Sequence, residues 1–222
     1  MPHATVTLLL ASASPARLAV LRAAGVEPLV RVSGVDEDAS VQAAERALGA
    51  PLEPADVALL LARAKAEDVA GRLDAEVDAD ADLVLGCDSV LELDGEVHGK
   101  PADAAEAVAR WHRMRGSNGT LHTGHWLVDR RDEEDGGTGG LVGATASTVV
   151  HFADLADDEV EAYVATGEPL RVAGAFTIDG LGGPFVAGIE GDHGNVVGVS
   201  LPLLRELVLE LGIPWHALRR DG

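Results

Sequence analysis

The stretch LVLGCDSVLELDGEVHGKP, residues 83–101, carries the strongest structural signals of the chain. Its apolar beginning, Leu83–Leu85, predicts a buried strand that runs up to Asp88 and continues beyond it. Asp94-Gly95 is typical of a two-residue hairpin turn, after which the chain returns toward Lys100. Because a carboxylate on a buried strand needs a cation or a cleft, we expect Asp88 and Lys100 to share one end of a sheet, where α/β proteins bind ligands.

Lysine usage supports a role for this region. The chain has 15 arginines but only two lysines, Lys65 and Lys100. An ammonium group kept where guanidinium groups are otherwise used indicates a position that arginine does not fill. We interpret Lys100 as functional because it is predicted close to Asp88; codon bias with chance survival is the alternative explanation.

Length and composition predict one α/β domain over residues 1–222, which can bury a full core. The net charge of −20 argues against binding to a nucleic-acid polymer or an anionic membrane surface. The simplest meaning of this charge is a solvated acidic surface that aids solubility. It leaves room for a small anionic ligand held by a few local cations.

Cysteine usage and the N-terminus predict a cytoplasmic protein. The lone Cys87 excludes an internal disulfide framework and fits a reducing compartment. No signal peptide is evident, and the apolar run at residues 5–11 is too short to span a membrane.

An anion-binding loop is predicted at residues 11–17, between a strand over residues 5–11 and a helix that ends at Gly25. Ser14 can cap this helix and Pro15 suits its first position. Free backbone N–H groups and the helix dipole both favour anions at such a terminus. An ordinary capped helix without a ligand is an equal alternative.

A possible metal site follows the second predicted strand, residues 29–33. Asp36, Glu37 and Asp38 stand in a row after it. Alone, such a run is usually a solvated turn, but beside a phosphate-binding loop it becomes a candidate for a hard cation. We interpret His122, His125 and His151 as structural, because they lie on predicted strands without tight ligand spacing.

The rest of the chain completes the α/β prediction. Residues 39–56 are predicted as loop or short helix, and 74–82, 130–140 and 191–198 as loops or turns. The remaining predictions are helices over 56–73, 102–115, 157–166 and 201–211 and strands over 120–129, 145–152 and 184–189.

Nine motifs in this order resemble the Maf-like nucleotide pyrophosphatases, also called septum-formation proteins. They cover nearly the whole chain: LASASPAR (10–17), VDE (35–37), ARAKA (62–66), GCDS (86–89), HGKP (98–101), TG (123–124), YVATGEP (163–169), AGAFTIDG (173–180) and GNVVGVSLPLL (194–204). The resemblance implies a long twisted mixed sheet flanked by helices, with two lobes around a central cleft. It also implies a homodimer that uses Mg²⁺ or Mn²⁺ to hydrolyse nucleoside triphosphates to monophosphate and diphosphate, with a role in nucleotide-pool sanitation and a link to cell-division arrest.

The family's functional positions map onto this chain residue by residue, and both of its lysines fall on them. Asp88 is then the proton acceptor or a metal ligand, and Glu37 a second carboxylate on the metal. The resemblance also assigns functional roles to Ser12, Arg17, Lys65 and Lys100. Our hypothesis is that Arg17, Lys65, Lys100 and the Ser12–Ser14 loop bind phosphate oxygens.

Base preference is where the sequence departs from the family patterns. The dTTP/UTP branch usually has Arg, Thr and Gln, and the 7-methyl-GTP branch often Trp, Gln and Glu, where this chain has Ala16, Ser89 and Asp179. Ionised Asp179 only accepts hydrogen bonds, which suits the donor edge of guanine better than thymine. We therefore expect a shift away from dTTP and UTP, unless Asp179 faces solvent.

Two other functions remain open at the level of sequence. One is an ITP/XTP pyrophosphatase of similar fold, against which the SASPAR and GCDS motifs weigh. The other is a non-catalytic, nucleotide-sensing regulator of septum formation. Binding alone would not need a general base, so the intact acids and lysines favour an enzyme.

Overall fold

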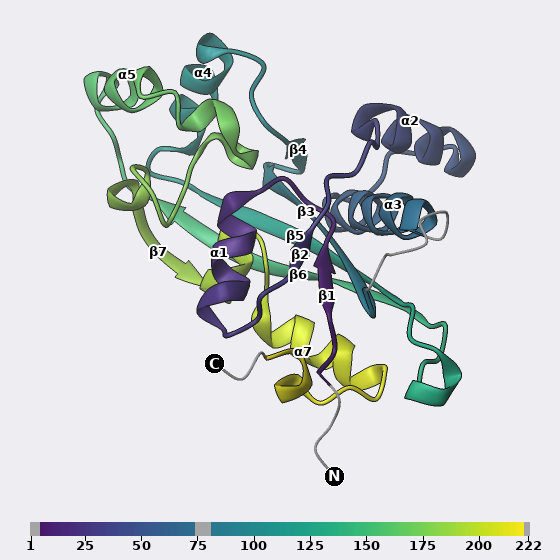
Figure 1. Ribbon diagram of the computed structural model, residues 1–222. Coiled ribbons are helices and arrows are strands. Elements are labelled where there is room, and N and C mark those ends of the chain that lie inside the picture. The colour runs from purple at the N-terminus through teal and green to yellow at the C-terminus, as the bar shows by residue number, and fades with distance from the viewer. Residues whose placement is uncertain (1–4, 74–80, 220–222) are drawn as a thin grey trace.

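The computed structural model describes residues 5–73 and 81–219, so most of the predicted acidic loop at 74–82 lies outside the described residues. Its strands are β1 (Leu8–Leu10), β2 (Leu29–Val30), β3 (Leu83–Leu93), β4 (Glu96–His98), β5 (Asn118–Asp129), β6 (Leu141–Phe152) and β7 (Val186–Glu190). They form one seven-stranded sheet in the order β2-β1-β3-β5-β6-β7, with β4 paired to β3 beside this path (Figure 1). The first three strands of this order are parallel and the other pairings antiparallel, so the predicted mixed sheet is confirmed.

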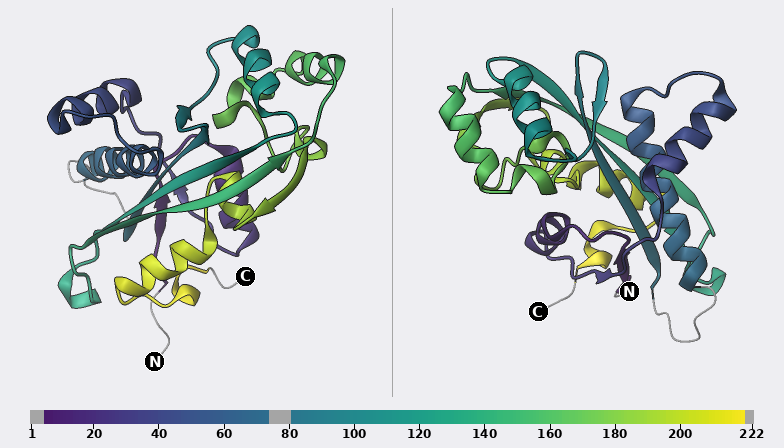
Figure 2. Two further views of the ribbon diagram at one scale, coloured as in Figure 1. Left: turned by 180° about the vertical axis from the view of Figure 1, so that it is seen from behind. Right: turned by 90° about the horizontal axis from the view of Figure 1, so that it is seen from above.

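Helices cover the sheet in separate groups (Figure 2). Their bounds are α1 (Pro15–Ala23), α2 (Glu37–Leu48), α3 (Pro54–Leu73), α4 (Ala104–Met114), α5 (Asp157–Ala165), α6 (His193–Val197) and α7 (Leu201–Glu210). Short 3₁₀ turns lie at Glu133–Asp135, Pro169–Arg171, Ala173–Ala175, Gly183–Phe185 and Trp215–Leu218. Figure 1 shows α2 and α3 together on one side of the molecule and α4 with α5 on another.

The alternation of side chains along the strands explains this arrangement. In β1, Leu8 and Leu10 join a buried cluster with α1 and α7, whereas Leu9 joins a different cluster with α3. In β3, Leu83 and Leu85 face the α7 side and Val84 faces α3. β1 and β3 are therefore buried on both faces, which is why β1 and the start of β3 are apolar throughout.

Helix α3 lies unusually close to the sheet because two glycines leave room for it. A Cβ atom at Gly86 of β3 would stand 2.0 Å from the carbonyl oxygen of Ala62, and one at Gly124 of β5 would stand 2.2 Å from that of Ala58. Real side chains never reach such distances, so both positions need glycine. This close approach sets how far a side chain from α3 can reach across the sheet.

One edge of β3 is open in its middle. Strand β1 pairs with it only as far as Leu85, and β4 pairs only from Leu91 onward. Between these points, no strand of the described chain covers this edge, although β5 pairs along the other. Asp88 and Ser89 lie in the gap, at the middle of β3.

Most predicted elements are confirmed, with boundary shifts. Asp94 and Gly95 both have positive φ, 52° and 80°, which confirms the tight hairpin turn. The prediction of loop or short helix at 39–56 is wrong, because α2 is a full helix of 12 residues. The turn predicted at 191–198 contains the short helix α6, and β2 covers only part of 29–33.

Among the helices of the described chain, none combines the length and the apolar character that crossing a membrane requires.

Candidate active site

A single cavity of about 710 Å³ brings together the predicted site residues except Asp36, which caps α2. Its volume falls within the range of small-ligand sites, roughly 300–1,000 Å³. The predicted residues on its walls are Ser12, Ser14, Ala16, Arg17, Glu37, Lys65, Asp88, Ser89, Lys100 and Asp179. They come from the loop after β1, the first turns of α1 and α2, the middle of α3 and β3, and two loops of the α4–α5 side.

On the α3 face of β3, two carboxylates converge on one ammonium group. Lys65 forms a short ion pair with Asp88, and its Nζ lies 2.7 Å from Oε1 of Glu37. The Asp88 side chain is 9% exposed, and that of Glu37, at the first position of α2, is 53% exposed. With two acids and one base, this group carries a net negative charge and can accept a further cation.

Burial dominates the electrostatics of Asp88. Desolvation raises the pKa of its carboxyl above the ordinary value, while the charges of Lys65 and Arg17 oppose that shift. Glu37 adds to the rise because it is a second acid. The surroundings therefore make Asp88 a stronger base than an exposed aspartate.

On the opposite face of β3, Arg17 is held by three neutral acceptors. Its Nη1 donates to Oγ of Ser12 at 3.1 Å, and its Nη2 donates to Oγ of Ser89 at 3.0 Å. Its Nε donates to the carbonyl of Gly198 at 3.1 Å. Neutral acceptors orient the guanidinium without cancelling its charge, so the group can still bind an anion.

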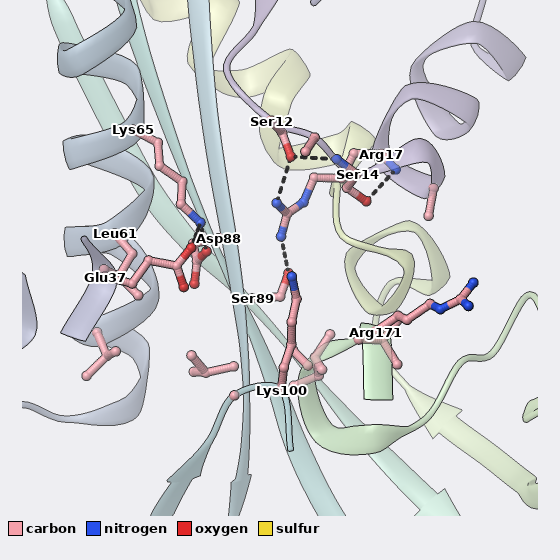
Figure 3. A pocket seen from close by; sticks show the side chains of 18 of the residues that line it. Ser12, Ser14, Arg17, Glu37, Leu61, Lys65, Asp88, Ser89, Lys100 and Arg171 are labelled. Atoms are coloured by element: carbon pink, nitrogen blue, oxygen red, sulfur yellow. Dashed lines mark hydrogen bonds and ion pairs between the residues drawn. The ribbon is translucent and has the colours of Figure 1, made fainter. Parts of the chain in front are cut away.

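The two groups are separated by the strand that carries them. Asp88 and Ser89 are neighbours in β3, so their side chains point to opposite faces of the sheet. Figure 3 shows Lys65, Asp88 and Glu37 on one side of this strand and Ser12, Arg17 and Ser89 on the other. Both groups reach the same cavity because the edge of β3 is open here.

Asp88 lies in the middle of β3, which continues beyond it as predicted, and the strand end at the site is that of β1, which stops beside Leu85. The sequence places Lys100 near Asp88, and both residues line the cavity, but the ion pair of Asp88 is with Lys65. Lys100 is exposed on another wall and makes no ion pair within the described ranges.

The loop around Asp179 is fixed by a carboxylate outside the cavity wall. Glu168 accepts hydrogen bonds from the hydroxyls of Tyr163 and Thr177 at 2.9 and 2.6 Å and from the backbone N–H groups of Leu181 and Gly182 at 3.0 and 3.1 Å. Although burial opposes it, these hydrogen bonds lower the pKa of Glu168. Asp179 is exposed and lines the cavity.

Sequence reasoning missed one cationic residue of the site. Arg171 lines the cavity and is exposed, and its side chain forms no hydrogen bond or ion pair with another described residue. It lies between the motifs at residues 163–169 and 173–180, so neither motif singled it out. Buried His125, predicted as structural, donates from Nδ1 to the carbonyl of Thr123 and accepts at Nε2 from the N–H of Ser200.

Comparison with known proteins identifies the family of this chain. The model of the family described as Maf-like protein matches residues 7–211. Proteins named nucleoside triphosphate pyrophosphatase from Salinispora tropica, Streptomyces coelicolor and Leifsonia xyli subsp. xyli are 58%, 57% and 55% identical. The matches cover 97%, 92% and 95% of this chain and 88%, 90% and 95% of those proteins. The chain therefore belongs to the Maf-like protein family.

Proposed function

We propose that this protein hydrolyses nucleoside triphosphates to nucleoside monophosphate and diphosphate. The observation that carries the proposal is the cavity itself: a buried carboxylate, Asp88, stands beside Lys65, while Arg17 and Lys100 line the other walls. Triphosphate cleavage needs mainly charge neutralisation and an aligned water, and this arrangement can supply both. The names of the 50–58% identical relatives support the same reaction.

The chain's own residues divide the chemistry between them. A water oxygen bonds to the α-phosphorus while the bond from that phosphorus to the bridging oxygen of the β-phosphate breaks. Asp88 accepts the proton of the water, and diphosphate leaves with the bridging oxygen. Arg17, Lys100 and the Ser12–Ser14 loop hold phosphate oxygens, and Lys65 keeps Asp88 ionised in its buried position.

A divalent cation fits the acidic group. Glu37 and Asp88 converge on one point, now occupied by the ammonium group of Lys65, and Mg²⁺ or Mn²⁺ is bound in proteins by one or two carboxylates plus substrate phosphates. Within the described residues, no group of three or more His, Cys, Asp or Glu side chains could hold a metal alone. Glu37 and Asp88 would hold the ion together with the substrate, where it would neutralise phosphate charge and lower the pKa of water. Asp88 is thus the proton acceptor, the metal ligand, or both.

The base preference is proposed to lie away from dTTP and UTP. Asp179 sits on the loop that Glu168 fixes, with Ala16 on the same cavity. An ionised carboxylate accepts but does not donate, which matches the N1–H and N2–H₂ groups of guanine. The alternative is that Asp179, which is exposed, faces only solvent and does not contact the base.

A nucleotide panel tests the proposal. The pure protein is incubated with Mg²⁺ or Mn²⁺ and canonical and modified triphosphates, and diphosphate release is measured. Release from a subset supports the enzyme, and a ranking that favours guanine over thymine and uracil supports the role of Asp179. Binding without turnover would instead support the non-catalytic regulator.

The setting of the activity is part of the same proposal. We infer a cytoplasmic homodimer that acts in nucleotide-pool sanitation, with a link to cell-division arrest. The lone Cys87, which is buried, suits a reducing compartment. Sedimentation velocity tests the dimer directly.

A further inference from the structure

We propose that Thr123 is a positioning residue, which fixes Arg17 for substrate binding by orienting the hydroxyl of Ser89. Thr123 lies on β5 opposite Ser89 and is completely buried, so it cannot contact a substrate itself. The inference rests on the proposed function, because it explains how Arg17 is oriented to bind the phosphate groups of the substrate.

The direction of each hydrogen bond follows from counting protons. The hydroxyl of Thr123 donates to the carbonyl of Asn195 at 2.9 Å, and a carbonyl can only accept. Thr123 has no second proton, so in its 2.9 Å contact with Ser89 it must be the acceptor. Ser89 therefore donates its hydroxyl proton to Thr123 and accepts a hydrogen bond from Nη2 of Arg17.

This chain of hydrogen bonds has a consequence for the role of Ser89. Its proton points toward Thr123 in the interior, so Ser89 is not a hydrogen-bond donor to the substrate. It serves as an acceptor for Arg17, and its effect on the substrate passes through that arginine. A guanidinium has five N–H groups; three of them donate to protein acceptors, which leaves two for phosphate oxygens.

Helix α6 holds Arg17 from two directions. The carbonyl of Asn195 is the last acceptor in the series of hydrogen bonds that runs from Arg17 through Ser89 and Thr123. The carbonyl of Gly198, directly after the helix, accepts from Nε of Arg17. A Cβ atom at position 198 would stand 2.9 Å from that same Nε, so the contact is also sterically close.

The helix is in turn tied to β6. Buried Thr148 accepts from the side-chain amide of Asn195 at 3.0 Å and from the N–H of Asp192 at 3.1 Å, and it donates to the Asp192 carbonyl at 3.2 Å. Hydrogen bonds through both α6 and β5 therefore fix the position of Arg17 relative to the sheet. This gives a physical role to the TG and GNVVG motifs, which supply no group to the reaction.

A double-mutant cycle tests the proposal, with diphosphate release from the best substrate of the panel as the readout. Thr123→Val keeps the shape of the side chain and removes its hydroxyl. We expect kcat/KM to fall roughly tenfold, the size of one hydrogen bond to a charged group, mainly through a higher KM. Thr123→Ser restores the hydroxyl and should recover kcat/KM to within about threefold of wild type.

The decisive comparison is made in the Ser89→Ala background. If Thr123 acts through Ser89, Thr123→Val should cost less than about twofold there, because coupled residues are not additive. An equal loss in both backgrounds, or no rescue by Thr123→Ser, would overturn the proposal and leave Thr123 a purely structural residue.

Folding and function are controlled separately. Thermal unfolding of every variant shows whether the fold is kept, and Thr123→Ala replaces Thr123→Val in the cycle if the valine variant does not fold. Turnover by the wild-type protein in the same assay tests the proposed function on its own. Wild-type activity with an additive cycle overturns the positioning role alone, whereas an inactive wild type overturns the function on which it rests.

Discussion

The two faces of β3, at Asp88 and at Ser89, differ in whether the positive charge beside them is compensated. On the α3 face, Lys65 is shared by two carboxylates, so its charge is fully compensated and the group attracts cations. On the other face, Arg17 contacts only hydroxyls and a carbonyl in its hydrogen bonds, so its charge remains available to anions. One strand thickness keeps the acid and the guanidinium apart while both reach one cavity, which shows how a site can hold opposite charges without mutual neutralisation.

The largest expected difference between the two faces is in turnover. Asp88→Asn removes the proposed proton acceptor and should lower kcat by about 10²–10⁴-fold, the usual contribution of a general base. Ser89→Ala, on the other face, should act mainly on KM. Steady-state diphosphate release measures both, and thermal unfolding verifies that Asp88→Asn still folds. Near-wild-type turnover of Asp88→Asn would remove Asp88 from the mechanism.

The stability of the acidic face depends on a compensated charge. Lys65→Met leaves Asp88 buried without its partner and should lower the free energy of unfolding by about 3 kcal/mol at neutral pH. Adding Asp88→Asn removes the unpaired charge and should recover most of this loss. Urea unfolding measures the three proteins, with exposed Arg63→Met on the same helix as the matched control. A loss in the double variant as large as in Lys65→Met would show that packing, and not charge, explains the effect.

The Arg17 face should instead be sensitive to acid. Burial lowers the pKa of His125 to about 4, and the positive charge of Arg17 adds to this lowering. Between pH 6.5 and 4 the unfolded chain binds a proton at this histidine and the folded chain does not, so stability falls as pH falls through this window. The difference amounts to about 3 kcal/mol.

The pH prediction is checked with one variant. Unfolding of wild type and His125→Gln is followed from pH 7 to pH 4, and the variant should show a shallower loss of stability. Parallel curves for the two proteins would mean that His125 does not carry the acid sensitivity.

A smaller effect is expected from the spacing of α3. Gly124→Ala forces the new methyl group against the carbonyl of Ala58, and overpacking of this kind costs about 1–3 kcal/mol. Because α3 carries Lys65, the displacement should also lower activity. Gly188→Ala on β7 is the control, since a Cβ there meets nothing within 4 Å. Equal behaviour of both variants in urea unfolding would contradict the close-approach argument.

Much of the fold could be predicted because its elements bury regular apolar patterns. β3, β5, α3 and α7 all show them, and the Asp94-Gly95 turn is specified locally. Helix α2 was missed for the same reason: it is the one long helix in the described chain with no buried residue, so it has no apolar stripe to detect. Its cap Asp36, which accepts from the N–H of Ala39 at 3.0 Å, was the available signal.

The membership of the site could be predicted, but not its internal pairing. Motif order identified Asp88, Lys65 and Lys100, and the two lysines stood out further because the chain has no others. Which lysine pairs with Asp88 depends on how closely α3 approaches the sheet, and that depends on two glycines whose neighbours are remote in sequence. The hydroxyl chain through Thr123 also joins residues from three separate segments, so no local pattern reveals it.

The gap along β3 has a further consequence for association between molecules. An uncovered strand edge normally invites a strand from another chain and so promotes aggregation. Here the uncovered stretch is recessed, with Asp88 6% and Val90 4% exposed, between the ends of β1 and β4. A small flexible molecule can enter this recess, but a second polypeptide strand has no room to align with it, so the opening can persist at high protein concentration without seeding intermolecular sheets.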